Sequence, residues 1–238
     1  MKPVFKIQIF ILNDYLIYSQ YGIIYTHRMG NSSTKENLIT AAVEIFALKG
    51  YRDATVLEIC KKAEANVAAI NYHFSSKEKL FKIALKQAFK LAEATHPIRG
   101  TLTLEAPPQD RLRAFMEAVI KRIFDPGPSG LFDRILSHEG TREHTPPGML
   151  ISEIQKLQGD FIESIVTDLI GSPTTLLNRQ ARINIIALCI FPNIAKPARA
   201  ILFPIHPTPD EIQSFIDGQV AFALAGLAAL SNIEKTRS

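Results

Sequence analysis

Helix-starting signals between residues 33 and 80 constrain the fold of this chain more than any other feature. A serine or threonine precedes a glutamate by three positions at Ser33, Thr55 and Ser75. Such a pair is typical of a capping box, in which the two side chains bond backbone amides at the start of a helix. Together with apolar residues at helical spacing, these signals predict four helices, which span residues 34–50, 55–63, 67–74 and 77–94.

The second and third of these helices are short, and a tight turn at Glu64-Ala65 separates them. Asn66 is a suitable N-cap for the third helix. Two short helices joined in this way form a helix-turn-helix, a unit that places its second helix in the major groove of DNA. The pattern therefore predicts a DNA-binding unit whose reading helix is residues 67–74.

Composition is compatible with this interpretation and narrows the alternatives. The chain has 238 residues, of which 47% are hydrophobic, with a net charge of +4 and a pI of about 9.0. A sizeable core is expected, and the mild positive charge suits a nucleic acid partner. Cys60 and Cys189 lie far apart within apolar helical patterns, which indicates buried thiols in a reducing cytoplasm.

The sequence carries no catalytic pattern. We find no nucleophile beside a base, no paired buried carboxylates and no phosphate-binding loop. His138-Glu139 and Glu143-His144 match no strong zinc motif, and Pro146-Pro147 beside them indicates an exposed loop. We therefore expect neither an enzyme nor a metal or cofactor site.

The N-terminal segment is apolar over residues 3–25, but polar side chains interrupt it too often for a membrane span or a secretory signal. Alternation from Phe5 to Ile11 is typical of a strand, although no partner strand is evident. Met29 precedes a polar lead-in to the first helix. We expect residues 1–28 to be a loose extension or upstream reading frame, with a membrane-surface arm as the alternative. N-terminal sequencing of protein made from its own promoter tests this, and a product that begins at Met1 would contradict it.

Beyond residue 108 the chain continues as helical patterns separated by prolines and glycines. The predicted helices span residues 109–125, 131–140, 149–170, 175–200 and 209–230. Pro192 and Pro197 interrupt the fourth pattern and predict a kink or an end. Because nothing after residue 29 reads as a sheet, the predicted fold class is all-α.

The first part of the chain resembles the TetR family of one-component transcriptional regulators over residues 34–80. The residues that carry the resemblance are Ala41-Ala42, Phe46, Lys49-Gly50-Tyr51, Thr55-Val56, Ile59, Ala63, Tyr72-His73-Phe74, Lys77 and Leu80. Residues 69–74 and 222–227 also resemble the subgroup with a CecR-type ligand domain. The resemblance implies an N-terminal three-helix helix-turn-helix domain at residues 32–80, joined to a larger helical ligand-binding and dimerisation domain at residues 81–234.

Two positions depart from the family pattern. Glu64 stands in the turn where members usually have glycine, and a left-handed backbone there would cost glutamate about 1 kcal/mol. Asn71 stands where many members have tyrosine, so base contacts of other members do not transfer to this chain.

The predicted DNA contacts lie on the third helix and at the starts of its neighbours. They are Thr55, Val67, Ala68, Ala69, Asn71, Tyr72, His73 and Lys77. Asn71 is a candidate for a bidentate bond to adenine, and the two alanines permit methyl contact with thymine. An exposed Asn71 without a base contact is the alternative. The resemblance implies phosphate contacts for the last three residues; Thr55 caps its helix, contacts phosphate, or does both, and Phe74 is expected in the core.

The resemblance also implies that a small molecule binds among the helices of the second region. Candidate pocket residues are Phe115, Phe132, Glu139, Arg142, Phe161 and Asn184. For the aromatic members, ordinary core packing is the alternative.

A second copy of the chain is the expected protein partner, through the helices near 175–200 and 210–230. Small residues of the last helix permit close approach between helices, and Phe222 adds apolar area. The predicted function is a ligand-responsive repressor that binds a palindromic double-stranded DNA operator as a homodimer and is released by a small molecule. The alternative is a helical ligand-binding protein or all-α enzyme that has lost specific DNA binding.

Overall fold

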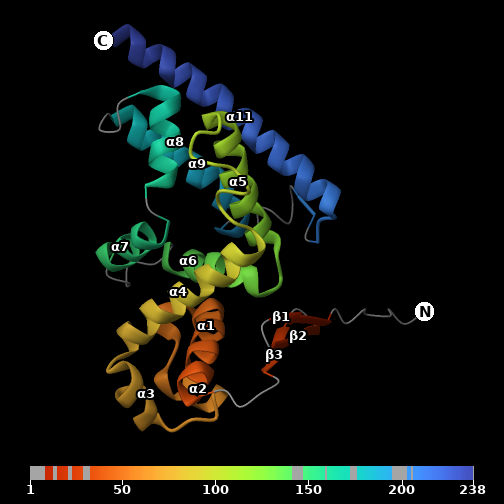
Figure 1. Cartoon of the computed structure of the whole chain (residues 1–238), viewed down its shortest axis with the longest axis vertical. Helices are drawn as coiled ribbons and strands as arrows, with labels where there is room; N and C mark the ends of the chain where they lie inside the picture. Colours follow the sequence, from red (N-terminus) through yellow and green to blue (C-terminus); the bar gives the residue numbers. More distant parts are fainter. Residues whose placement is uncertain are drawn as a thin grey trace, which may run out of the picture.

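The computed structural model describes residues 9–12, 15–20, 23–28, 33–140, 147–158, 160–171, 176–194, 203–204 and 206–237. From Thr34 onward every described regular element is a helix (Figure 1). The all-α prediction is therefore confirmed for the two domains.

The four helices of the first domain are present. They are α1 (Thr34–Asp53), α2 (Val56–Lys62), α3 (Val67–Phe74) and α4 (Lys77–Thr95). The capping boxes at Ser33 and Thr55 are formed, but the third predicted box is wrong. Ser75 ends α3 in a left-handed conformation with φ +66°, whereas Ser76 caps α4 by accepting a hydrogen bond from the Lys79 amide at 3.1 Å. An N-cap needs an extended backbone, so the second serine takes that role.

The second domain contains seven described elements. They are α5 (Pro108–Phe124), the short 3-10 helix η1 (Pro128–Gly130), α6 (Leu131–Gly140), α7 (Pro147–Gln158), α8 (Phe161–Ile170), α9 (Leu176–Ile194) and α11 (Pro209–Arg237). The single helix predicted over 149–170 is wrong, because the chain breaks between α7 and α8. Asp160 has φ −90° and ψ 27°, outside the helical range. The apolar residues keep their helical spacing across this short break, so the sequence pattern did not reveal that α7 and α8 are separate helices.

The N-terminal extension forms a small antiparallel sheet in the order β1 (Ile9–Leu12), β2 (Tyr15–Gln20) and β3 (Ile23–Arg28). In its register, Tyr18 pairs with Ile9 on one side and with Tyr25 on the other. Within the described residues, the later part of the predicted strand pattern, Ile9 to Ile11, lies in β1, and the next segment of the chain supplies its partner strand. Alternation within one strand does not reveal which segment will pair with it.

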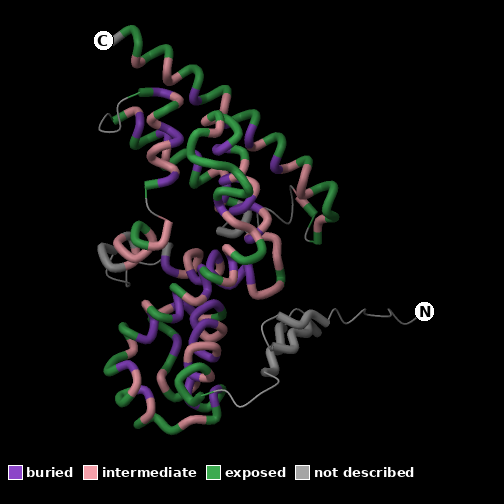
Figure 2. Tube along the Cα trace, viewed as in Figure 1, coloured by how far each residue is buried: buried purple, intermediate pink, exposed green. Residues whose placement is uncertain are grey.

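Two hydrophobic clusters hold the helices together, and Figure 2 shows the buried positions running along the inner faces. One cluster joins α1, α2, α3 and α4, and the other joins α5, α8, α9 and α11. The predicted domain boundary at residue 80 falls inside α4, whose buried residues extend to Ala92. Leu131, Phe132 and Ile135 of α6 belong to the first cluster. Helix α6 therefore lies in the second domain by sequence but packs with the first.

Candidate nucleic-acid interface

Buried side chains in the core of the first domain fix the position of the turn between α2 and α3. Ile59 of α2 and Ile70 and Phe74 of α3 are almost completely buried, so the prediction that Phe74 belongs to the core is confirmed. The Ala65 amide donates to the Cys60 carbonyl at 2.9 Å and closes the turn. Glu64 adopts φ +52°, the left-handed conformation that disfavours a side chain with a Cβ. The turn thus has the left-handed backbone conformation that glycine favours, although glutamate occupies this position.

Helix α3 turns its remaining face outward. Val67, Ala68, Asn71 and Tyr72 are exposed, and Tyr72 is 84% accessible to solvent. Each of these four residues lies one, three or four positions from others in the set, which is the spacing of residues that share one face of a helix. The structure therefore brings half of the predicted DNA contacts together on one surface. Ala69 is half-buried and packs against the first cluster.

His73 and Thr55 are engaged within the protein. The half-buried His73 ring lies 4.8 Å from the Tyr72 ring, centroid to centroid. The Thr55 hydroxyl accepts from the Glu58 amide at 3.2 Å and donates to the Glu58 carboxylate at 2.9 Å, so its capping role is confirmed. Hydrogen bonds from Lys49 and Thr55 lower the pKa of Glu58 to about 2, which keeps a negative charge beside the cap.

Lys77 begins α4, but its side chain folds back instead of extending into solvent. Its Nζ lies 4.7 Å from the centre of the Tyr51 ring and donates to the Arg52 carbonyl at 3.3 Å. Burial lowers the pKa of Lys77, and the charges of Asp53 and Glu139 act in the opposite direction. The last turn of α1 therefore sets the position of this cation. Sequence analysis placed Tyr51 among the residues that carry the family resemblance, but it did not identify Tyr51 as a partner of Lys77.

The predicted pocket residues do not form one site. Phe115 and Phe161 meet in the second cluster with ring centres 6.4 Å apart, whereas Phe132 packs on Phe89 in the first cluster. Asn184 is exposed on α9. Glu139 is buried at the end of α6, where its Oε1 accepts a hydrogen bond from the Tyr51 amide at 2.6 Å.

Arg142 lies outside the described residues, as do Glu143 and His144. His138 and Glu139 belong to α6, not to the exposed loop that the prolines suggested. Within the part of the chain that the structure describes, no three histidine, cysteine or acidic side chains gather as metal ligands. Cys60 and Cys189 are both free and buried, as predicted.

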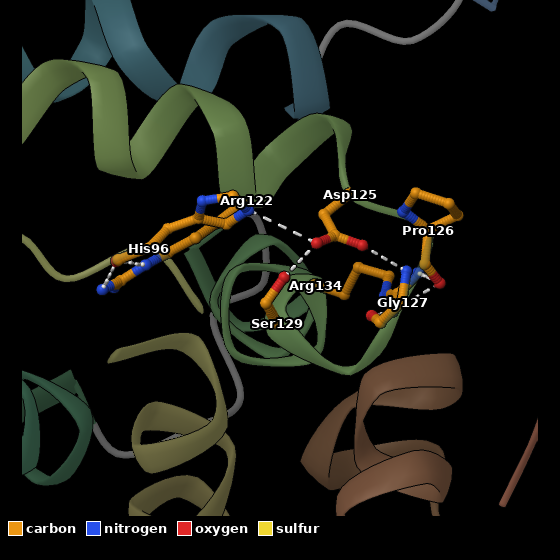
Figure 3. Close-up of polar contacts among 7 residues, drawn as sticks. All are labelled: His96, Arg122, Asp125, Pro126, Gly127, Ser129 and Arg134. Carbon is orange, nitrogen blue, oxygen red and sulfur yellow. Dashed lines mark hydrogen bonds and ion pairs between the residues drawn. The ribbon is translucent and has the colours of Figure 1, made fainter. Parts of the chain in front are cut away.

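A polar joint, formed by His96, Arg122, Asp125, Ser129 and Arg134, connects the end of α4 to α5, η1 and α6 (Figure 3). The guanidinium of Arg122 is fully buried; its Nε donates to the His96 carbonyl at 2.9 Å and its Nη2 pairs with Glu93. Burial opposes the charge of Asp125, but hydrogen bonds from His96, Ser129 and the Gly127 amide lower its pKa overall. These contacts anchor the helix that links the two domains.

Asp133 of α6 lies in the same interior region. Burial raises the pKa of its carboxyl to about 7, although the charge of Arg122 works against that rise. Sequence reasoning missed this group, because the spacing of α6 shows only that its neighbours Phe132 and Ile135 are apolar. The joint combines the end of α4 with residues 122–134, and Arg122 lies 26 positions after His96.

An apolar surface covers the outer sides of α9 and α11. Its large exposed members are Leu176, Ile183, Ile186, Phe191, Phe222 and Ile233.

Helix α11 is the one described helix that could cross a membrane by length and composition, with a mean hydropathy of 1.4 over its most apolar window. Its inner side packs in the second cluster through Ile216, Val220 and Leu227. A half-open groove of about 350 Å³ lies at its edge, lined by Leu169 of α8 and by Leu224 and Ala228.

Comparison with known proteins agrees with this architecture. Residues 38–83 match the family described as bacterial regulatory proteins, tetR family. The HTH-type transcriptional regulator SrpR of Pseudomonas putida is 26% identical over 132 residues, which are 56% of this chain and 57% of SrpR. The probable HTH-type transcriptional regulator YttP of Bacillus subtilis is 38% identical over 58 residues, 24% of this chain and 28% of YttP. The chain thus spans just over half of SrpR and less than a third of YttP.

A solved structure has the same fold over most of the chain. The transcriptional regulator FadR from Bacillus subtilis, in complex with stearoyl-CoA, superposes with a TM-score of 0.59 at 18% identity over 80% of this chain and 98% of FadR. These relatives are transcriptional regulators, not enzymes. The matched helix-turn-helix and the helical second domain make the chain similar to DNA-binding transcriptional regulators of the TetR family.

Proposed function

We propose that the chain is a repressor that binds a palindromic DNA operator as a homodimer and leaves it when a small molecule binds. The observation that carries this proposal is the division of α3 into a buried side, with Ile70 and Phe74, and an outward side, with Asn71 and Tyr72. Side chains on such an outward side reach base edges and phosphates when the helix lies in the major groove. Contacts from Thr55, His73 and Lys77 to the DNA backbone complete the proposed interface.

The homodimer supplies the second reading helix. One eight-residue helix reads few base pairs, and a two-fold pair reads two half-sites about one DNA turn apart. The apolar surface of α9 and α11 supports this arrangement, because its exposed Ile183, Phe191 and Phe222 favour burial against an identical surface. In this proposal the apolar character of α11 serves a protein interface in the cytoplasm, not a membrane.

The effector is proposed to bind within the second domain. The interior of α5, α8, α9 and α11 is lined by apolar side chains that include Phe115 and Phe161. FadR, which shares this fold, holds stearoyl-CoA, so an effector with a long apolar group is the first class to test. Such a ligand lowers operator affinity only as far as it prefers the released conformation over the bound one. The CecR-type likeness of residues 69–74 and 222–227 stays a prediction.

Genomic selection tests this function directly. Purified protein is mixed with fragmented genomic DNA at moderate salt, and bound fragments are sequenced. Recovery of a palindrome supports the proposal and identifies neighbouring genes. A matched control is the Asn71→Ala, Tyr72→Ala double variant, which leaves the buried side of α3 intact and should recover no palindrome. Salt-sensitive, sequence-blind binding by the wild type would contradict the proposal and favour a protein that has lost specific DNA binding.

A further inference from the structure

The last turn of α1 departs from helical geometry at Gly50. Its φ is +78° and its ψ is 175°, so the peptide that carries the Tyr51 amide turns out of the helical direction. That amide donates to Glu139 Oε1 at 2.6 Å. The acceptor comes from the second domain, 88 residues later in the chain. Residues 51–53 are therefore held at one end by α6.

The contact leaves no room for variation at Gly50. A Cβ at this position would lie 3.0 Å from both Glu139 Oε1 and the Cβ of His138. Glu139 is only 7% exposed, and its carboxylate is directed at the break in α1. The contact therefore requires both residues: Gly50 leaves space for the Glu139 carboxylate, and Glu139 accepts the hydrogen bond.

The segment held in this way controls Lys77. The Tyr51 ring lies under the Lys77 ammonium at 4.7 Å, and the next residue, Arg52, supplies the carbonyl that Lys77 bonds at 3.3 Å. The Tyr51 ring also packs on Phe46 and Phe81, with ring centres 6.3 and 5.0 Å away. A shift of the Tyr51 backbone would therefore move both partners of this cation.

We propose that Glu139 is a positioning residue for DNA binding, which holds the Tyr51 amide and thereby places Lys77 at the DNA-facing start of α4. This inference rests on the proposed function, because it takes Lys77 to contact phosphate. It adds a role in the second domain for a residue that touches no DNA. A displacement of α6 by an effector would release this contact directly.

Two substitutions separate the hydrogen bond from packing. Glu139→Gln keeps an oxygen acceptor at the same position, whereas Glu139→Met keeps the length of the side chain without an acceptor. We expect Glu139→Met to bind a labelled duplex recovered in the genomic selection about tenfold more weakly, and Glu139→Gln to bind it within about twofold of wild type. Glu117→Met is the matched control, because Glu117 pairs with Lys121 on its own helix and far from α1 in the chain.

Hydrogen exchange of the Tyr51 amide, measured by NMR, provides a readout that does not require DNA. The amide should be protected in wild type and Glu139→Gln and should exchange faster in Glu139→Met. Gly50→Ala should produce the same faster exchange from the opposite side of the contact.

Equal DNA affinity of Glu139→Met and wild type would overturn the inference, as would equal losses in the Met and Gln variants. A wild type that binds no duplex would instead refute the proposed function. In that case Tyr51 exchange unchanged in Glu139→Met would refute the positioning contact as well.

Discussion

At the scale of single residues, Asn71 of α3 and Lys77 at the start of α4 have different surroundings. Asn71 is exposed on the outward side, whereas Lys77 is held against Tyr51 beside the same surface. A base-reading residue and a phosphate-binding residue differ in what their loss changes. If the proposed roles hold, specificity and general affinity should therefore be separable in this interface.

Replacing Asn71 by alanine should relax selectivity at one operator position, at a cost of about 1–3 kcal/mol for the preferred base. Replacing Lys77 by alanine should weaken binding to all sequences alike and reduce the salt slope by about 1. Binding titrations against a set of single-base operator variants at several salt concentrations measure both effects. Lys90→Ala, farther along α4, is the control; a uniform loss from Asn71→Ala would refute its base-reading role.

The turn before α3 carries measurable backbone strain. Glu64 has φ +52°, where a residue with a Cβ is disfavoured by about 1 kcal/mol. Glu64→Gly should therefore stabilise the protein and raise its Tm by about 2–4 °C in a thermal unfolding experiment. Glu64→Ala keeps a Cβ and should give no such gain; an equal rise in both variants would mean that the glutamate side chain, not the backbone, is unfavourable.

At the scale of elements, helix starts depend on which residue adopts an extended backbone. Ser76 satisfies this condition with φ −157° and ψ 159°, while Ser75 is left-handed. The two serines are therefore not equivalent, although either suits the local sequence.

Ser76→Ala should cost about 1 kcal/mol of stability, because the Lys79 amide loses its acceptor. Ser75→Ala should have a much smaller effect, since no hydrogen bond of the Ser75 side chain supports α4. Urea denaturation of the two variants compares them. A larger loss in Ser75→Ala would restore the capping box predicted from Ser75 and Glu78.

At the scale of the whole molecule, α4 and α6 connect two separately packed clusters. The polar joint anchors α4 to α5 through Arg122, and Glu139 anchors α6 to α1. Both connections bury charged groups, so stability at this junction depends on protonation.

The raised pKa of Asp133 determines whether the stability of the protein rises or falls with pH. Its folded pKa of about 7 lies above the ordinary value of 3.8, so between these values the folded protein holds a proton that the unfolded chain has lost. The Asp133 contribution to stability is therefore largest at low pH, declines as pH rises towards 7 and is constant above it. In Asp133→Asn this decline should vanish, as measured by denaturant midpoints at pH 5, 6, 7 and 8, with Asp160→Asn as the exposed control. Equal pH profiles in wild type and Asp133→Asn would contradict the raised pKa.

The apolar surface makes a prediction for assembly. Phe222→Lys places a charge on the exposed side of α11, where Phe222 is 70% accessible, and should convert a dimer to monomers. Sedimentation over a concentration series measures the change, and Lys235→Glu near the groove is a charge-changing control. A wild type that is monomeric at all concentrations would refute the dimer; one that partitions into lipid vesicles would favour a membrane role for α11.

The sequence by itself determined the helices of the first domain, because capping residues and apolar spacing are local signals that Ser33, Thr55 and Asn66 carry without help from distant segments. It also predicted that Phe74 lies in the core and not on the DNA-facing side of α3. Only the tertiary structure decided how the helices combine. The Glu139–Tyr51 contact, the burial of Arg122 and Asp133 and the packing of α6 on the first cluster join segments far apart in the chain. A carboxylate can also lie on a solvated helix face. Its burial therefore follows from three-dimensional packing and not from its neighbours in sequence.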